Sequence, residues 1–347
     1  MKERSLYIPG DAIGISQEQE QEAELMRAAG GKGQWQHFTP EFVGTKTQEV
    51  DQKRVFREIK QQQILFQEAR VSQPEGKVKI ETDLPVSIFF VGDIHFGSIY
   101  SDHERFRKEM EEIANTPNAY VVFMSNLIDN AIPSQYPANM LVNAIPPDKQ
   151  VVVMRQIVQG LDEKGRVLGA VVSDCHEGWT WRHTGQDINA LIYGFEDRKF
   201  PVLENGGRLN ITVGKRKYVI GLYHKIGPFR SNFNRLHGLQ QMNRLQQNME
   251  CDVVVGAHYH VAAVETTYEG QGKEHRRPIV YIQSGSYKGI DKIHDQWSQT
   301  RYGRTGEPSA QSVELWPDKR RMEAFLEFDT GILAHECFFL KEMIKRE

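Results

Sequence analysis

Cysteine is scarce in this sequence, and long apolar runs are missing. The 347 residues include three cysteines, Cys175, Cys251 and Cys337, an odd number spread far apart. This pattern argues against a disulfide framework and predicts a reducing compartment. No apolar stretch reaches the roughly 18 residues that a membrane helix needs, and residues 1–14 lack the apolar segment of a secretory signal. We therefore expect a soluble, cytoplasmic protein.

A strong net charge and internal repeats are also absent. The formal net charge is −3, from 43 Lys and Arg against 46 Asp and Glu residues. A nucleic-acid-binding surface would therefore have to be a local basic patch. The hydrophobic fraction of 39% is ordinary for a globular protein, and this length allows one large core or a core with an appendage.

Three parts of the chain differ in composition and in the structure that they predict. Residues 1–75 are polar and rich in Glu and Gln, and they predict an N-terminal helical extension with helices near 16–33 and 49–70. We favour a solvated extension packed on the core over a binding arm, which has no specific signature here. Residues 76–300 form the predicted core, and residues 301–347 a C-terminal hairpin and helix that pack on it.

Short β-branched runs alternate with amphipathic segments in the core. This alternation predicts the α/β class, with β-α-β units early in the core and antiparallel pairing after about residue 208. The predicted strands are 86–91, 119–124, 167–172, 218–223, 252–256 and 279–284, with helices at 101–114 and 149–163. The C-terminal part predicts a hairpin over 312–328 and a last helix over 335–347.

Residues of the types that bind metals come directly after five apolar runs of the chain. Ligand sites form where the loops beyond the carboxyl ends of strands converge, so the five loops predict one shared site. Mixed Asp, Asn and His ligands suit Mn²⁺, Fe or Zn²⁺ better than Ca²⁺. The residues are Asp93 and His95, Asn126 and Asp129, Asp174 with His176 and Glu177, His224 with Lys225, and His258 with His260.

The sequence resembles the calcineurin-like metallophosphoesterases over roughly residues 86–290. Its "GDIHFG" matches their first block, "YHKIG" supplies a later His, and "GAHYH" closely matches their last block. The resemblance implies a four-layer α/β/β/α sandwich of the metallophosphoesterase type. It also implies two divalent metal ions, of which we expect Mn²⁺, with Fe or Zn²⁺ as alternatives.

The resemblance assigns ligands by position. Asp93, His95 and His260 would bind one ion, and His224 and His258 the other. Two ions about 3.5–4 Å apart would clamp a phosphate, supply a hydroxide and neutralise charge during an in-line displacement. Because neutral imidazoles and ionised carboxylates are the binding forms, activity should fall in acid.

Two middle blocks depart from the family pattern. Ser125-Asn126 stands where the family has Gly and a bridging Asp, and Ser173-Asp174 where it has Gly and Asn. Our hypothesis is that Asp174 takes over bridging while Asn126 binds one ion terminally, so that total ligand charge is kept. The alternative is a degraded site with one ion or none. An engineered Asn126 would leave Asp174 unexplained.

The family's general acid has two candidates in this chain. Either Cys175 occupies that position, or His176 reaches it across a one-residue bulge. We favour His176, because imidazolium is a better proton donor near pH 7 than a thiol. Asp129 matches the second Asp of the family's second block, and we expect it to orient a ligand His rather than bind metal.

Aromatic and basic residues near these loops favour a nucleic-acid substrate. Trp179, Arg182, Lys225 and Arg230 are the substrate-binding candidates, with Trp181, Lys288 and Lys292 close by. The opposing interpretation, buried aromatics and solvated cations, has about equal weight. We therefore predict a metal-dependent phosphodiesterase, a nuclease acting on DNA or another nucleic acid. The alternatives are a phosphomonoesterase acting on proteins or small molecules and a catalytically inactive scaffold.

Overall fold

The computed structural model describes residues 52–68, 73–133, 140–227, 234–245, 251–269, 276–289 and 309–345. The chain divides into two units between Ile64 and Leu65. In the first unit the described element is the start of helix α2, Gln52–Glu68, which agrees with the helix predicted at 49–70. The helix predicted near 16–33 lies outside the described residues.

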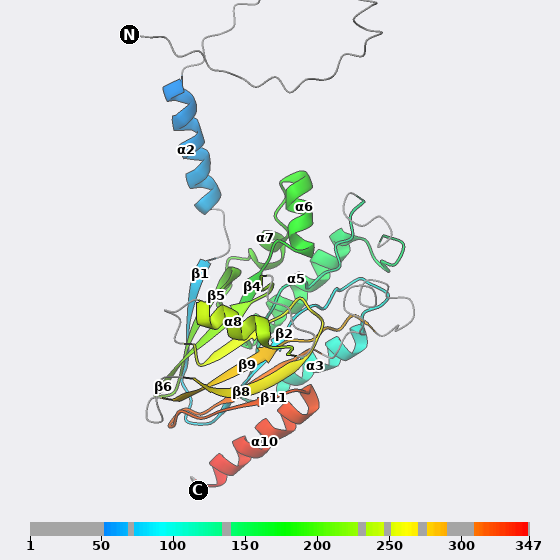
Figure 1. Cartoon of the computed structure of the whole chain (residues 1–347). Helices are drawn as coiled ribbons and strands as arrows, with labels where there is room; N and C mark the ends of the chain where they lie inside the picture. Colours follow the sequence, from blue (N-terminus) through cyan, green and yellow to red (C-terminus); the bar gives the residue numbers. More distant parts are fainter. Residues whose placement is uncertain are drawn as a thin grey trace, which may run out of the picture. The chain divides into compact units, whose positions relative to one another are not determined.

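The second unit has a mixed α/β fold built on one large sheet (Figure 1). Its described strands follow the order β11-β10-β2-β3-β4-β5-β6-β7-β9-β8, and β1 pairs with β5 beside this path. The strands are β1 Gln73–Ile80, β2 Val86–Val91, β3 Ala119–Phe123, β4 Val167–Val172, β5 Val202–Val213, β6 Arg216–Tyr223, β7 Val253–Gly256, β8 Ala263–Glu269, β9 Arg277–Gln283, β10 Gln311–Leu315 and β11 Met322–Phe325. The helices are α3 His103–Asn115, α5 Pro147–Glu163, α6 His176–Thr184, α7 Ile188–Tyr193, α8 His237–Leu245 and α10 Phe328–Ile344.

The predicted β-α-β units are present. Strands β2, β3 and β4 are parallel, with α3 and α5 between them in sequence. Every residue of β2 and β4 is buried, as expected for parallel strands covered on both faces. Their carboxyl ends therefore lie at one edge, where the predicted ligand loops begin.

The later strands pair differently from the prediction. Antiparallel pairing occurs for β5 with β6 and for β8 with β9. However, β6 pairs in parallel with β7, and β7 with β9, so the expectation of antiparallel pairing after residue 208 was partly wrong. Helix α8, which the sequence analysis missed, lies between β6 and β7 in the chain and provides the crossover that a parallel pair needs.

Strand β5 changes partners along its length. Val202–Glu204 pair with β4, whereas Gly207–Val213 pair with β6 and largely also with β1. Gly206, at the change, has φ of 118°, and an added Cβ at Gly207 would lie 2.3 Å from a backbone oxygen of Pro74. Glycine is required where the backbone is left-handed or this close.

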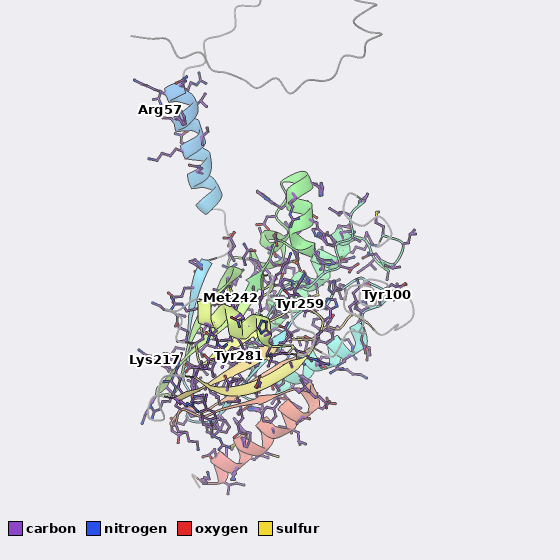
Figure 2. All side chains as sticks on the ribbon, in the orientation of Figure 1. Arg57, Tyr100, Lys217, Met242, Tyr259 and Tyr281 are labelled. Carbon is purple, nitrogen blue, oxygen red and sulfur yellow. The ribbon has the colours of Figure 1, made fainter. Side chains whose placement is uncertain are left out.

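Three apolar clusters surround the sheet. Phe89 and Val91 of β2 belong to the first cluster, with α3, α5 and α7, whereas Ile88 and Phe90 belong to the second, with β5, β6 and β7. Successive strand residues point to opposite faces, so both faces of β2 are covered. Tyr281 belongs to a third cluster, against which Met242 and Tyr259 pack (Figure 2).

The C-terminal hairpin adds to the sheet beside β2. Strand β10 pairs antiparallel with β2 and with β11, as the predicted hairpin requires. Helix α10 begins at Phe328 rather than at the predicted His335. His335 is buried, and its Nδ1 lies 2.9 Å from Glu314 Oε1 of β10. Among the described helices, none has the length and apolarity to cross a membrane.

Candidate metal centre

Backbone hydrogen bonds bring the predicted ligand loops together. Asp93 donates its backbone N–H to the carbonyl oxygen of Ser125, and His95 donates to that of Asn126. The segment after β2 therefore runs alongside the segment after β3. The His258 backbone N–H donates to Asp93 Oδ2 at 2.6 Å, which adds the loop after β7.

Asp93, His95 and His260 form the first donor group. All three are buried, and their donor atoms lie within 4.8 Å of one another. The Nε2 atoms of His95 and His260 are 3.1 Å apart and lie 3.7 and 3.5 Å from Asp93 Oδ1. Two ligands about 2.1 Å from one ion at the tetrahedral angle are separated by about 3.4 Å. The group therefore fits one divalent cation.

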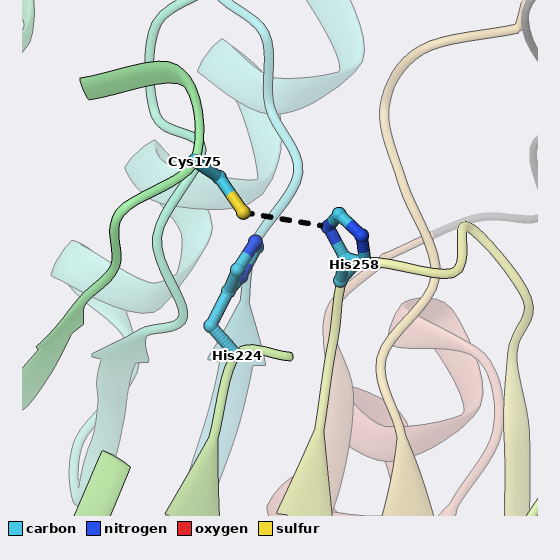
Figure 3. A group of neighbouring side chains, drawn as sticks. All are labelled: Cys175, His224 and His258. Atoms are coloured by element: carbon cyan, nitrogen blue, oxygen red, sulfur yellow. Dashed lines mark hydrogen bonds between the residues drawn. The ribbon is translucent and has the colours of Figure 1, made fainter. Parts of the chain in front are cut away.

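Cys175, His224 and His258 form the second donor group. Figure 3 shows the three side chains pointing toward one another, from the loops after β4, β6 and β7. Cys175 Sγ lies 3.7 Å from His258 Nδ1. A thiolate with two imidazoles is a donor set typical of zinc.

The His224 ring is oriented as a metal ligand would be. Its Nδ1 donates to the carbonyl oxygen of Met124 at 2.6 Å, which leaves Nε2 with the lone pair. Nε2 is buried and has no hydrogen-bond partner among the described residues. A buried polar atom without a partner costs free energy, and a cation in the second group would satisfy it.

Asp129 and His176 form a third donor group with His95, which this group shares with the first one. Asp129 Oδ1 is 3.2 Å from His95 Nδ1 and 2.9 Å from Lys288 Nζ. Burial opposes ionisation of this carboxyl, but the Lys288 ammonium, His95 and His176 together outweigh burial and hold the pKa of Asp129 well below its usual range. His176 Nδ1 lies 2.5 Å from the Asp129 carbonyl oxygen, and the ring packs edge-on against His95. The structure thus places both predicted catalytic residues at the centre.

Asn126 contacts the first donor group and the start of α6. Its Nδ2 donates to Asp93 Oδ1 at 2.8 Å, and its Oδ1 accepts from the backbone N–H of His176 at 3.4 Å. Asn126 is the residue at which the sequence comparison expected a bridging carboxylate. As an amide it brings no negative charge there.

Asp174 is turned away from this centre. Its side chain is 69% exposed and pairs with Arg182 at 3.1 Å. Cys175, one residue further on, is buried and faces His224 and His258 instead. The hypothesis that Asp174 bridges two ions therefore disagrees with the geometry. In this turn Cys175, rather than Asp174, is the residue whose side chain joins a donor group.

Several centre residues have left-handed backbones. Among the described non-glycine residues with positive φ are Asp93, His95, Ser125, Asn126, His258 and His260, with values between 48° and 76°. Such conformations are uncommon without glycine and are held in place by the surrounding structure. They place His258 and His260 on a bent loop rather than on an extended strand, where the two side chains belong to different donor groups.

Burial favours the neutral form of four histidines of the centre. Burial lowers the pKa of His258 to about 3 and of His176 to about 4, and also lowers those of His95 and His224. Neutral imidazole is the form that binds metals. Burial raises the pKa of the Cys175 thiol to about 12, so a cation that binds the thiolate must displace a proton.

Two residues have roles that the sequence analysis missed. Buried Glu177 accepts the backbone N–H of Leu127 at 2.6 Å and that of Asn126 at 3.3 Å, so it clamps the loop after β3. Lys288 is 5% exposed and holds Asp129, so it does not belong to the surface cations considered for nucleic acid. The role of Glu177 could have been suspected from the sequence, because Glu177 is a carboxylate that directly follows His176.

The predicted substrate-binding residues divide into two sets. Trp179 is 8% exposed and its ring centroid lies 4.0 Å from that of His176, so burial removes it as a stacking surface. Arg182 and Lys225 are exposed beside the centre, and Trp181 is 43% exposed. Arg230 and Lys292 lie outside the described residues.

No family model matches the sequence, and no curated protein matches it. Among solved structures, the chain is similar to Vps29 from Entamoeba histolytica, determined with zinc, at 15% identity and a TM-score of 0.32, covering 69% of this chain and 97% of that one. It is also similar to a metallophosphoesterase from Sphaerobacter thermophilus, at 11% identity and a TM-score of 0.32, covering 73% of this chain and 93% of that one. Similarities at this level decide neither family nor function, so the residues of the centre carry the assignment.

Proposed function

We propose that the chain is a metal-dependent phosphoric ester hydrolase of the calcineurin-like metallophosphoesterase type. The observation that carries this proposal is the convergence of two three-residue donor groups at strand ends, with His224 Nε2 buried and unsatisfied. The motifs "GDIHFG" and "GAHYH" supply four of the six donors. The proposed fold is the four-layer α/β/β/α sandwich, and it is supported by apolar clusters on both faces of β2.

The residues of the centre have distinct proposed roles. When bound, two divalent ions would supply a hydroxide at neutral pH and neutralise charge on the phosphate. Asp129 and Lys288 fix the orientation of His95. His176 is the proposed general acid: burial keeps it neutral in the free protein, and an anionic phosphate beside it would raise its pKa toward the working range.

The two donor groups favour different metals. A carboxylate with two imidazoles accepts Mn²⁺, Fe or Zn²⁺, so the first group agrees with the sequence-based preference for Mn²⁺. A thiolate with two imidazoles favours Zn²⁺ over Mn²⁺. We therefore propose Zn²⁺ for the second group, with Cys175 in place of the oxygen ligand.

For the substrate we propose a phosphodiester, and within that class a nucleic acid. The support is local: Arg182 and Lys225 place positive charge beside the centre, and the exposed face of Trp181 suits base stacking. One observation favours a second candidate, a catalytically inactive binding module. Asn126 brings no charge to the bridging position, and a weakly held second ion would abolish turnover while leaving a phosphate-binding surface.

Hydrolysis of three substrates tests the proposal. Bis-p-nitrophenyl phosphate, p-nitrophenyl phosphate and a single-stranded oligonucleotide are incubated with protein loaded with Zn²⁺, Mn²⁺ or both. We expect cleavage of the diester and the oligonucleotide, and at least a 100-fold loss in His95→Ala. His183→Ala, an exposed histidine on α6, is the matched control and should retain activity.

The alternatives give different results in the same assay. Cleavage of the monoester alone would indicate a phosphomonoesterase. A fully metal-loaded protein that cleaves none of the three would be the inactive module. Full activity in His95→Ala would show that the metal assignment itself is wrong.

A further inference from the structure

Helix α10 is apolar on two opposite sides. Its inner side packs on the sheet, where Phe328, Ile332 and His335 are at most 5% exposed. An added Cβ at Gly331 would lie 2.4 Å from Ser312 Oγ, so the helix backbone approaches β10 closely there. Figure 1 shows the sheet on one side of α10 only. The residues of the inner side therefore suffice to pack α10 on the sheet, without a contribution from the outer side.

The outer side carries an exposed apolar stripe. Leu333 is 61% exposed, Leu340 57% and Ile344 70%. Cys337 and Thr330, which complete the row, are exposed as well. Contiguous apolar surface of this kind on a folded protein marks an interaction site more often than chance. We call residues Thr330, Leu333, Cys337, Leu340 and Ile344 the α10 stripe.

The spacing within the α10 stripe is that of a coiled coil. The steps between its members are three, four, three and four residues, which is the alternation of heptad positions a and d. Thr330, Cys337 and Ile344 take the a positions, and Leu333 and Leu340 the d positions. A helix that only covers a sheet has no need of a second stripe with this period.

We propose that α10 pairs in parallel with α10 of a second copy of this chain, forming a two-fold symmetric dimer. Identical stripes on identical helices are self-complementary, as a two-fold interface requires. The proposal is independent of the chemistry proposed for the metal centre. It gives each dimer two such centres.

Charges beside the α10 stripe favour the parallel orientation. Glu336 precedes the a position at Cys337, and Lys341 follows the d position at Leu340; both are exposed. In a parallel pair, a residue at position g faces position e of the partner, five residues later in sequence. Glu336 would therefore face the partner's Lys341 on both sides of the dimer. In an antiparallel pair g faces g, and this match would be lost.

Cys337 reports directly on the orientation. Equivalent a positions face each other across a parallel pair, at a separation within the about 4.4–6.8 Å between Cα atoms that a disulfide spans. Cys337 is exposed, whereas Cys175 and Cys251 are buried. An added oxidant would therefore join the two Cys337 thiols, taking two electrons as two protons leave.

The length of the α10 stripe limits the affinity. Two heptads bury less than the about 800 Å² per partner typical of stable interfaces. We therefore expect a dimer with a dissociation constant in the micromolar range. The protein would be dimeric at high concentration and dissociate on dilution.

Light scattering of the full chain over a concentration series, at 0.1 M salt, measures the dimer. We expect a monomer–dimer transition in wild type and only monomer in Leu340→Glu. Leu245→Glu alters a leucine that is 63% exposed on α8 and serves as the matched control, which should dimerise like wild type. Copper phenanthroline should give a disulfide-linked dimer in wild type and none in Cys337→Ser.

A charge swap tests the orientation separately. Glu336→Lys and Lys341→Glu should each raise the dissociation constant about 3- to 10-fold, because two exposed ion pairs become repulsive contacts. The double variant should return it close to the wild-type value. Circular dichroism of each variant confirms that the exposed substitutions leave the fold intact.

Two results would overturn the proposal. A monomer at all concentrations would mean that α10 does not pair with a second copy of this chain. A dimer that persists in Leu340→Glu, or that forms no Cys337 disulfide, would place the interface elsewhere or make it antiparallel.

Discussion

On metal binding, Cys175 would supply the negative charge of the second donor group, in which the other two donors are neutral imidazoles. Divalent cations need anionic ligands nearby, and Asn126 provides none. The thiol is buried against His258, where its pKa is raised to about 12 in the absence of a cation. Metal binding should therefore convert it to a thiolate and release a proton.

Replacing Cys175 by serine should remove a spectroscopic signal of the second group. With Co²⁺ in place of Zn²⁺, the wild-type protein should show a sulfur-to-cobalt charge-transfer band in the near ultraviolet. In Cys175→Ser the band should vanish, and affinity for the second ion should fall about 10- to 100-fold as a soft ligand is lost. Asp174→Asn, one residue away and exposed, should change neither. A band that survives in Cys175→Ser would refute the ligand assignment.

Restoring a carboxylate at Asn126 should make the protein more dependent on metal. In Asn126→Asp the new carboxylate would face Asp93 at the position where Nδ2 now donates at 2.8 Å. Without metal we expect a loss of about 1–3 kcal/mol in the free energy of unfolding, because a hydrogen bond is replaced by like-charge repulsion. Zn²⁺ should more than recover it. Thermal melts in EDTA and in Zn²⁺ measure both effects; unchanged melts would place Asn126 away from the ions.

Most members of the two donor groups were predictable from the sequence, but the inward-facing residue after β4 was not. Asp93, His95, His224, His258 and His260 follow strands directly, so their convergence could be predicted from strand-end placement. In the turn after β4, strand-end placement does not predict which side chain faces the centre. Asp174 and Cys175 are neighbours, and only the backbone conformation decides which one faces inward.

At the scale of elements, Gly331 allows α10 to approach the sheet. A Cβ there would lie 2.4 Å from Ser312 Oγ, so Gly331→Ala should lower the free energy of unfolding by about 1–3 kcal/mol through overpacking. Gly160 on α5 is the matched control, since a Cβ there meets nothing within 4 Å. Gly160→Ala should stabilise by about 0.5–1 kcal/mol through helix propensity. Urea unfolding measures the change in unfolding free energy in both variants. Equal changes in the two variants would contradict the close approach of α10 to β10.

The anchor of α10 should make stability depend on pH. Burial works against a charged His335, but the hydrogen bond and charge of Glu314 outweigh it and raise the pKa of His335 above its ordinary value of 6.5. A folded-state pKa above the unfolded value gives stability that is present below pH 6.5 and lost as pH rises through the folded-state pKa. The difference in unfolding free energy between wild type and His335→Gln should therefore shrink as pH rises from 6 to 9. A constant difference would show that His335 stays neutral.

Strong periodic elements were predictable, and elements without a distinct pattern were not. Strands β2 and β4 match their predicted bounds because each is an uninterrupted apolar run. Helix α10 starts earlier than predicted, at Phe328. Phe328 and Ile332 pack in the first apolar cluster, and these tertiary contacts stabilise the additional N-terminal turns of the helix. Helix α8 was missed because its short sequence is mostly polar.

At the scale of the whole molecule, the metal centre joins loops from distant parts of the chain. The first group links the loop after β2 to the loop after β7, and the second links the loops after β4, β6 and β7. Ions that bind only the folded state stabilise it by mass action, by about 2.7 kcal/mol at 100 times the dissociation constant. Metal should therefore protect the whole unit against unfolding.

We propose that the two donor groups hold two divalent ions. Elemental analysis of protein dialysed against Zn²⁺ and then against metal-free buffer tests it most directly. We predict two ions per chain in wild type, one in the Cys175→Ser/His224→Ala variant and one in the Asp93→Ala/His260→Ala variant. Wild-type protein that retains no metal, while remaining folded, would show that neither donor group is a metal site.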